Sequence, residues 1–419
     1  MKTQSAALVK DHLRQFFSQN GHIPHWYVGF SGGLDSALLL ALASDLLPKE
    51  RLTAVHINHQ LQSAANDWQN RCQDIANSLG IAYKTIQVDC ASSSEAAARE
   101  ARMGAFEAVL PANCGLLLAH HATDQAETLL MRLVRGTGVS GAAGMQDRRS
   151  FGLGEIFRPL LSFTRKQLEK AALELKLSWV EDPSNHKSDY ARNFIRLQVA
   201  PILETRWVGW DQNIAKGAAR FAEADELLKE LADTDIEKLV EWQRLDLAAF
   251  AQLSLARRKN IIYRWLGIYL LMVPSSDLVE QLAKLTLDSK GEWRVATLTL
   301  HAYKGFLYLE QEKPLATDSI KWQSPSESCQ FTCGELRLSK GECDDVLHVR
   351  TRIDGEKVHI PQRGGQVAIK KLMNEQQIPP WQRDLWPVVE LNGKVISIPG
   401  VWEDGSIPFS IEFKVNSAP

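Results

Sequence analysis

The sequence has few cysteines, and no pair of them has metal-binding or redox spacing. Only six of its 419 residues are cysteine, and no CxxC occurs. A zinc ribbon or finger therefore has no support, and a chain of this length does not need a disulfide framework. We expect free thiols in a reducing compartment.

Long apolar runs are also missing. The apolar stretch at residues 266–273 ends before Pro274 and is far shorter than the about 18 residues of a membrane-spanning helix. The amphipathic N-terminal segment lacks the apolar core of a secretory signal. These absences predict a cytoplasmic protein that does not insert into a membrane.

Charge of one sign does not dominate the chain. Its 48 basic and 50 acidic residues give a net charge of −2, which by itself argues against a nucleic-acid partner. The balance differs between regions, because residues 131–210 contain 13 Lys or Arg against 8 Asp or Glu, whereas residues 221–250 contain 3 against 9. A near-neutral protein with this distribution can carry a local phosphate-binding face.

Length and composition predict several folded domains. Hydrophobic residues make up 45% and charged residues 23% of the chain, as is typical of globular proteins. At about 150 residues per domain, two or three domains are expected. We expect an N-terminal domain over residues 1–215, a helical domain over 216–315 and a small α+β domain over 320–419, where short strand-like segments alternate with Gly and Pro turns.

The first half of the chain alternates strand-like and helix-like segments. The predicted strands are 26–30, 52–57, 81–88 and 115–119, and the predicted helices are 37–47, 63–79, 94–110, 123–134 and 165–177. Residues 136–154 are rich in glycine and are predicted to form a long loop. Repeated βα units with nearly continuous apolar strands favour an α/β fold, a doubly wound parallel sheet with helices on both faces.

A glycine turn directly after the first predicted strand is the strongest motif. It consists of Ser31, Gly32, Gly33, Leu34, Asp35 and Ser36. The two glycines allow a tight turn and a close approach of the backbone to an anion, and the helix that follows offers unpaired N–H groups. The carboxylate of Asp35 can hold Mg²⁺ against phosphate oxygens. The lysine of a Walker A loop is absent, so this is a different kind of phosphate-binding loop.

This turn resembles the pyrophosphate loop (PP-loop) of the N-type ATP pyrophosphatases. Members of that superfamily cleave ATP between its α and β phosphates and adenylate an oxygen of an acceptor. The resemblance implies ATP and Mg²⁺, with ATP bound by the six loop residues. His56 and Asn58 end the second predicted strand, where open α/β sheets bind ligands, and join this ATP-binding set. The loop alone does not identify the acceptor.

Further polar residues narrow the choice of acceptor. They are Glu95, Arg99 and Arg102 at helical spacing, His121, Asp124 and Glu127 after the fourth predicted strand, Arg132 and Arg135, and finally Arg192 and Arg196. In this order they resemble the tRNA(Ile)-lysidine synthetase family, which modifies the wobble cytidine of an isoleucine tRNA. The resemblance covers nearly the whole chain, including RPLL at 158–161, EDPSN at 181–185, RNFIR at 192–196 and KKLMNEQQIPPWQRDLWPVV at 370–389.

The chain departs from the family pattern at a few positions. The family usually has two adjacent aspartates in an HxDDQxET pattern, and here Thr123 replaces the first while Asp124 retains the second. Met103 stands where tyrosine is common, Gln60 where glycine is frequent and Gly29 where alanine is usual. We infer that Asp124 can still serve, whereas position 123 carries no carboxylate.

The resemblance implies a carbon–nitrogen ligase. It would convert ATP, L-lysine and tRNA with a CAU anticodon into lysidine-tRNA, AMP and pyrophosphate, which changes codon reading from AUG to AUA. The cytosine carbonyl oxygen is a poor leaving group, so ATP first converts it to an adenylate. We assign Asp35 to Mg²⁺, Asp124 to a second metal or to base catalysis, and Arg192 to the phosphoryl charge.

The second step needs a group that accepts a proton from lysine and residues that bind the tRNA. A neutral lysine amine must attack, and Asp124 or Glu127 could take its proton, a choice that the sequence leaves open. The other candidates at this site are His59 and His121. The predicted contacts to tRNA or cytidine are Glu95, Arg99, Arg102, Arg132, Arg135, Arg196, Lys370, Lys371 and Arg383. A homodimer is compatible with the sequence, which gives no oligomeric state.

Two other functions compete with this hypothesis. A tRNA thiolation enzyme shares the loop and the substrate class, but it generally needs a persulfide cysteine or cysteines that hold an iron–sulfur cluster. No CxxC exists here, and no cysteine adjoins these motifs in the sequence. A non-catalytic nucleotide-binding module would have no reason to carry Asp35, Asp124 and Arg192 together, and it would release no pyrophosphate.

Overall fold

The computed structural model describes residues 5–58, 65–88, 95–180, 191–241, 243–270, 273–311, 319–323, 325, 327–331 and 334–415. Two compact units divide the chain, residues 1–228 and 229–419. Within the ranges described, no helix combines the length and the apolar character that crossing a membrane requires.

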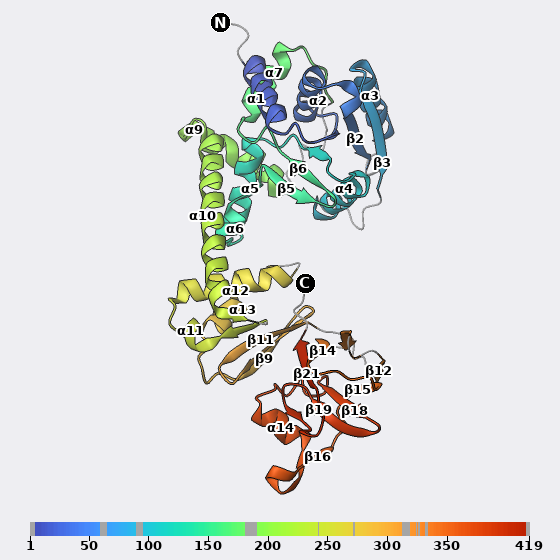
Figure 1. Cartoon of the computed structure of the whole chain (residues 1–419). Helices are drawn as coiled ribbons and strands as arrows, with labels where there is room; N and C mark the ends of the chain where they lie inside the picture. The colour runs from blue at the N-terminus through green and yellow to red at the C-terminus, as the bar shows by residue number, and fades with distance from the viewer. Residues whose placement is uncertain are drawn as a thin grey trace. The chain divides into compact units, whose positions relative to one another are not determined.

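A six-stranded sheet in the order β3-β2-β1-β4-β6-β5 forms the centre of the first unit (Figure 1). Its strands are β1 Trp26–Gly29, β2 Leu52–Asn58, β3 Ala82–Gln87, β4 Gly115–Leu117, β5 Arg148–Phe151 and β6 Gly154–Phe157. All neighbours pair in parallel except β5, which runs antiparallel to β6 at the edge. The predicted doubly wound α/β fold is therefore confirmed, with one antiparallel edge strand added.

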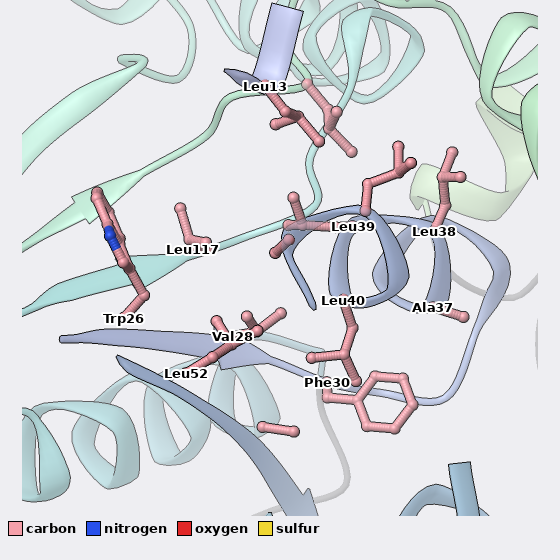
Figure 2. Close-up of a cluster of buried hydrophobic side chains, with 14 of the residues drawn as sticks. Leu13, Trp26, Val28, Phe30, Ala37, Leu38, Leu39, Leu40, Leu52 and Leu117 are labelled. Atoms are coloured by element: carbon pink, nitrogen blue, oxygen red, sulfur yellow. The ribbon is translucent and has the colours of Figure 1, made fainter. Parts of the chain in front are cut away.

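Helices cover both faces of this sheet. They are α1 Ser5–Gln19, α2 Leu34–Leu46, α3 Ala65–Ser78, α4 Glu95–Val109, α5 Ala122–Val134 and α7 Arg165–Glu174. Alternate residues of β2 show the two faces, since Leu52 and Ala54 pack into the core with α1, α2 and α7, whereas Val55 and Ile57 pack into a second core with α4. Figure 2 shows the first core, where the α2 leucines lie over β1.

The strand order places the topological switch point of the sheet between β1 and β4, and we call the region outside the carboxyl ends of these two strands the crevice. The chain proceeds from β1 through β2 to β3 on one side of the sheet and from β4 to β6 on the other. At such a switch point the loops after the two central strands diverge, and ligands of open α/β sheets bind outside the carboxyl ends. The glycine turn follows β1 and the His120–His121 pair follows β4, so the fold brings both motifs to this crevice.

The segment 136–154 is not the long loop that its glycines predicted. It contains α6 Val139–Ala142, all of β5 and the first residue of β6. Gly152 adopts a φ of +53° in the tight turn between the two strands. Glycine here marks a hairpin turn and a helix end, and the strands on either side are too short to give a clear apolar alternation.

An interrupted helix and a long helix end the first unit. They are α8 Ala191–Phe194, a π-helical turn Ile195–Val199, α9 Ala200–Arg206 and α10 Trp210–Leu239. In the π turn the Ala200 N–H bonds to the carbonyl of Ile195, and Pro201 has no N–H to continue the regular pattern. The first residues of α10 belong to the first unit, where Ile214 and Ala218 pack on α5 and α6.

The second unit begins with a mixed layer of helices and strands. Its elements are β7 Val240–Glu241, β8 Arg244–Asp246, α11 Leu247–Ala251, α12 Leu255–Tyr269, α13 Ser276–Ala283, β9 Gly291–Val295, β10 Leu298–Tyr303 and β11 Phe306–Gln311. The strands form an antiparallel sheet in the order β7-β8-β11-β10-β9. The helical prediction for 216–315 holds for α10 to α13 but missed this sheet.

The C-terminal part of the second unit is rich in short strands, as predicted for 320–419. They are β12 Ile320–Trp322, β13 Cys329–Phe331, β14 Gly334–Lys340, β15 Leu347–Thr351, β16 Lys357–Ile360, β17 Gly365–Ala368, β18 Pro387–Leu391, β19 Lys394–Ile398, β20 Trp402–Glu403 and β21 Ser410–Val415. One helix, α14 Ile369–Glu375, lies between β17 and β18. The α+β expectation is confirmed.

Candidate active site

The glycine turn wraps around the start of α2 and is fixed by its own serines. Ser31 Oγ lies 3.1 Å from Ser36 Oγ, and Ser36 Oγ donates to the Gly33 carbonyl at 3.0 Å. Gly32 has a φ of +80°, in the left-handed region that favours glycine. Helix α2 begins at Leu34, directly after Gly33, so its first N–H groups would face an anion that binds at the turn.

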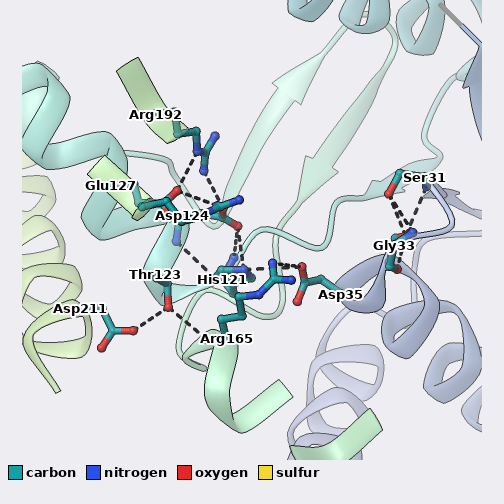
Figure 3. A network of polar contacts seen from close by, with 12 residues as sticks. Ser31, Gly33, Asp35, His121, Thr123, Asp124, Glu127, Arg165, Arg192 and Asp211 are labelled. Carbon is teal, nitrogen blue, oxygen red and sulfur yellow. Dashed lines mark hydrogen bonds and ion pairs between the residues drawn. The ribbon is translucent and has the colours of Figure 1, made fainter. Parts of the chain in front are cut away.

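Asp35 lies in the first turn of α2 and faces the loop after β4. Its Oδ2 atom is 3.4 Å from Arg165 Nη1 and 3.7 Å from His121 Nε2 (Figure 3). Its Oδ1 atom is buried and has no hydrogen-bond partner among the described residues. A buried carboxylate oxygen without a partner is costly, so this atom is the one available to an added ligand.

His121 and Asp124 form a reciprocal cap at the start of α5. The Asp124 backbone N–H donates to His121 Nδ1 at 3.3 Å, and the His121 backbone N–H donates to Asp124 Oδ2 at 3.0 Å. Burial alone would raise the pKa of Asp124, but electrostatic interactions with His121, Arg192 and His120 and the hydrogen bond from the His121 backbone N–H outweigh it and hold that pKa far below its ordinary value. Asp124 is therefore ionised at neutral pH.

Two arginines hold Asp124 and Glu127 from one side. Arg192 donates from Nη2 to Asp124 Oδ1 at 2.6 Å and from Nε to Glu127 Oε2 at 2.8 Å. Arg196, one turn later, donates from Nε and Nη2 to the two oxygens of Glu127, each at 2.8 Å. Glu127 is fully buried, so its carboxylate is shared between two guanidinium groups and is closed to solvent.

A basic group lies at the carboxyl ends of β4 and β6. Burial, together with the charges of Arg158, Arg192 and Arg102, lowers the pKa of His120 to about 3 against the opposing effect of Asp124. Arg158 is only 4% exposed, and its Nη1 atom donates to the Gln146 carbonyl at 2.6 Å. Its Nε atom and Nδ1 of His120 have no partner in the described part of the chain. This side of the crevice is suited to an anionic or hydrogen-bonding ligand.

The ends of β2 and β4 bring several other predicted residues to the crevice. His56 is buried with its Nδ1 atom 2.9 Å from the Phe30 carbonyl, just before the glycine turn. Asn58 is buried at the end of β2 and donates to Gln69 Oε1 at 3.0 Å. Arg99 and Arg102 belong to α4, of which Glu95 is the first residue. His59 and the segments 181–185 and 190 lie outside the described residues.

Some predicted tRNA contacts have structural partners instead of open surface. Arg132 donates to the carbonyls of Gly141 and Gly144 at 2.7 and 3.0 Å and so ties α6 to α5, whereas Arg135 at the end of α5 is exposed. In the second unit, Lys370 and Lys371 are exposed on α14. Arg383 is buried and donates to the Ile378 carbonyl and to Asn374, so it holds its own segment together.

One cysteine does adjoin the glycine turn in space, which the sequence did not indicate. A Cβ atom on Gly32 would lie 2.6 Å from Sγ of Cys72 and 2.8 Å from Nε1 of Trp68. Burial raises the pKa of Cys72 to about 12, so the side chain is a thiol and not a nucleophilic thiolate. Cys72 therefore packs the loop, and Trp68 Nε1 supports it with a 2.8 Å hydrogen bond to the Ser31 carbonyl.

Sequence reasoning missed Arg165 and Asp211. Arg165 is the first residue of α7 and contacts Asp35, while Asp211, in the first turn of α10, accepts a 2.6 Å hydrogen bond from Thr123 Oγ1 (Figure 3). The predicted helix 165–177 located the start of α7 in the sequence, and that start was the one available signal for Arg165. Nothing near Asp211 in the sequence signals its contact, which spans 88 positions.

The donor set fits a Mg²⁺ ion bound together with phosphates. No group of three or more His, Cys, Asp or Glu side chains is arranged to hold a metal within the described ranges. Mg²⁺ is commonly bound through one or two carboxylates, with substrate phosphates and water as its other ligands. The unpartnered Oδ1 of Asp35 beside the phosphate-binding turn meets that requirement, and the ionised Asp124 lies near the same His121 nitrogen as Asp35 does.

Family models match three parts of the chain. A PP-loop domain model matches residues 5–203, a TilS substrate binding domain model matches 245–308, and a TilS substrate C-terminal domain model matches 347–407. The three matches follow one another along the sequence without overlap.

Curated proteins match over nearly the full length. A tRNA(Ile)-lysidine synthase of Pseudomonas syringae pv. tomato is 36% identical over 91% of this chain and 90% of its own. A tRNA(Ile)-lysidine synthase of Serratia proteamaculans is 36% identical over 94% and 95%. Among solved structures, the U34-tRNA thiolase NcsA from Methanococcus maripaludis is 16% identical, with a TM-score of 0.45 over 53% of this chain and 80% of that one.

Proposed function

Because the chain belongs to the tRNA(Ile)-lysidine synthase family, we propose that it joins L-lysine to the wobble cytidine of isoleucine tRNA with a CAU anticodon. ATP activates the cytidine as an adenylate, and AMP and pyrophosphate are released. One observation supports the proposal most. Asp35 of the PP-loop and Asp124 of α5 both lie near Nε2 of His121, at 3.7 and 3.4 Å, and Asp124 is also bound by Arg192 of α8.

The PP-loop supplies the nucleotide half of the site. The backbone N–H groups at the start of α2 would bind the pyrophosphate that leaves ATP, and the hydroxyls of Ser31 and Ser36, bonded to each other and to the Gly33 carbonyl, fix the turn that presents them. Asp35 would hold Mg²⁺ through Oδ1, and Asp124 is the second carboxylate within reach of the same region. When bound, Mg²⁺ neutralises charge on the phosphate oxygens during attack on the α-phosphate.

Arg192 is the guanidinium best placed for the adenylation step. It is partly buried at 18% side-chain exposure, and it is held by two carboxylates that fix its orientation. A fixed positive charge stabilises negative charge that builds up in a transition state, because the protein does not have to reorganise. Arg196 shares Glu127 and supports the same arrangement.

Of the two carboxylates near the proposed lysine site, we choose Asp124 and not Glu127 as the one that contacts the substrate amine or a metal. Glu127 is fully buried and both its oxygens accept from arginines, so no substrate amine reaches it without breaking those bonds. Asp124 has the strongly lowered pKa of a carboxylate that stays ionised, which makes it a weak base but a good partner for a cation. We therefore assign Asp124 to binding the amine or a metal, and Glu127 to holding Arg192 and Arg196.

The basic side of the crevice suits the anticodon loop. An unstacked cytidine of a single-stranded loop can enter a pocket and be read by hydrogen bonds, while arginines contact its backbone phosphates. His120 lies close enough to Arg158 and to Arg102 to interact electrostatically with each, and Arg99 acts on Arg158. We propose this group, with exposed Arg135, as the contact to the anticodon arm, and Lys370 and Lys371 as contacts to more distant parts of the tRNA.

Product analysis with purified protein tests the proposal. ATP, Mg²⁺ and CAU-anticodon tRNA are incubated with and without lysine, and with a labelled sulfur donor in a parallel reaction. We expect AMP and pyrophosphate to accompany a lysine-containing tRNA. Sulfur incorporation would indicate a thiolation enzyme, and the absence of pyrophosphate with folded protein would indicate a binding module. Cell fractionation tests the predicted cytoplasmic location, and light scattering determines whether the chain forms a homodimer.

A further inference from the structure

A short hydrogen bond joins α5 to the beginning of α10. Thr123 Oγ1 donates to Asp211 Oδ2 at 2.6 Å, a length typical of a hydroxyl bonded to an ionised carboxylate. Asp211 is only 9% exposed, and its Oδ1 atom accepts from the Gln212 backbone N–H at 2.8 Å. Both carboxylate oxygens thus have partners in a place from which water is largely excluded.

Thr123 also fixes the start of α7. Its Oγ1 atom accepts from the backbone N–H of Arg165 at 3.1 Å. That N–H is one of the four at a helix start that have no partner within the helix. A hydroxyl has a single proton. Because Thr123 donates this proton in its hydrogen bond to Asp211, a lone pair of the hydroxyl oxygen is directed to the Arg165 N–H. The carboxylate of Asp211 therefore sets the direction in which Thr123 anchors α7.

The side chain of Arg165 connects Thr123 to Asp35 at the proposed nucleotide site. Its Nη1 atom lies 3.4 Å from Oδ2 of Asp35, whose Oδ1 atom stays buried and without a partner in the part of the chain that is described. Figure 3 shows the sequence of contacts from Asp211 through Thr123 and Arg165 to Asp35. The chain of contacts thus engages one oxygen of Asp35 and leaves the other available.

The packing of α10 holds Asp211 in a fixed position. Ile214 and Ala218, on the next turns of the same helix, pack with Leu129 of α5 and Ala142 of α6. Helix α10 therefore cannot shift along α5 without losing apolar contact. A carboxylate on this helix keeps a fixed position relative to Thr123.

We propose that Asp211 is a positioning residue for Asp35, acting through Thr123 and Arg165. It orients the Thr123 hydroxyl, which anchors the first residue of α7, so that Arg165 holds Asp35 with Oδ1 directed to a cation bound with ATP. The inference rests on the proposed function only for its use of ATP, and it concerns binding of magnesium–ATP and not the ligation of lysine.

Calorimetric titration of the full chain with ATP and Mg²⁺ tests this role. Asp211→Ala and Thr123→Val should each raise the dissociation constant about tenfold, since each removes one hydrogen bond to a charged group. The double variant should bind no more weakly than either single variant, because both changes break one chain of contacts. Thr123→Ser keeps the hydroxyl and should restore wild-type binding. Glu223→Ala removes an exposed carboxylate from the same helix and is the matched control.

Two further measurements separate positioning from a general structural effect. With the variants, the KM for ATP should rise at a temperature well below their thermal midpoints, while tRNA binding stays close to wild type. The proposal would be overturned if the dissociation constant of the double variant rose by the product of the two single-variant increases. It would also be overturned if the variants lost tRNA binding but kept magnesium–ATP binding. If Asp211→Ala does not fold, the comparison of Thr123→Val with Thr123→Ser decides alone. Failure of wild-type lysine incorporation would contradict the proposed function but would leave these binding results interpretable.

Discussion

The Nη2 atom of Arg192 lies 2.6 Å from Oδ1 of Asp124. This contact joins α8, late in the first unit, to the helix that follows β4, and Glu127 strengthens it by accepting from both Arg192 and Arg196. The acidic and basic groups of the site are thus paired, and their charges balance in a partly buried place.

Glu127→Gln should destabilise the first unit strongly. The substitution conserves volume but removes the charge that two partly buried arginines share, and it turns an amide N–H₂ toward them. We expect the free energy of unfolding to fall by about 3 kcal/mol, as for a buried ion pair that loses one partner. Urea unfolding measures the loss. Glu155→Gln is the control, because its partner Arg148 is 50% exposed at the side chain, and equal losses for both would contradict the account.

Asp35→Ala should abolish adenylation while tRNA binding persists. Without the carboxylate, Mg²⁺ loses its protein ligand beside the PP-loop, and we expect pyrophosphate release to slow by about a hundredfold or more. A coupled pyrophosphate assay and tRNA filter binding measure the two properties. Asp45→Ala changes an exposed residue on the same helix and serves as the control. Turnover of Asp35→Ala near the wild-type rate would remove Asp35 from the metal site.

Gly32→Ala and Gly33→Ala should differ although the two residues are adjacent. Gly32 has a φ of +80°, and a Cβ there would lie 2.6 Å from Cys72 Sγ, whereas the nearest atom to a Cβ on Gly33 is 3.5 Å away. The left-handed backbone and the contact together should cost Gly32→Ala about 2 kcal/mol of unfolding free energy and weaken ATP binding. Thermal unfolding compares the two variants. Equal destabilisation would mean that the turn does not depend on Gly32.

Asp404 should make the C-terminal region sensitive to acid. Lys394 and the N–H and hydroxyl of Ser406 lower the pKa of Asp404 from 3.8 to about 2. A lowered folded-state pKa contributes stability that is present above about pH 4 and is lost as the pH falls toward 2. Asp404→Asn should therefore lower the thermal midpoint at neutral pH but have little effect near pH 2. A pH-independent difference between the two proteins would contradict this assignment.

The sequence predicted the parts of the site that depend on local pattern. The turn at residues 31–36 needs glycine and lies between an apolar strand and an apolar helix, so both its structure and its place in the fold were readable. The His121–Asp124 cap follows β4 in the same way. Parallel strands with nearly continuous apolar residues identified the doubly wound sheet, because such strands are buried on both faces.

Contacts between distant residues could not be read in the same manner. Asp211 and Thr123 are 88 positions apart, and no spacing rule relates a helix start to a residue so far away. Arg383 looked like a surface cation but is 7% exposed, because its own segment folds around it. The sheet of β8 to β11 was missed since its strands are short and lie beside strongly helical segments.

Incorporation of labelled lysine into CAU-anticodon isoleucine tRNA tests the central claim most directly. The reaction contains the full chain, ATP and Mg²⁺, and the control tRNA has uridine at the wobble position. We predict ATP-dependent lysine incorporation into the cytidine tRNA and none into the uridine tRNA. Lysine that stays free while AMP forms would keep the adenylation chemistry but contradict lysine as the nucleophile. Incorporation that does not need the wobble cytidine would contradict the proposed substrate.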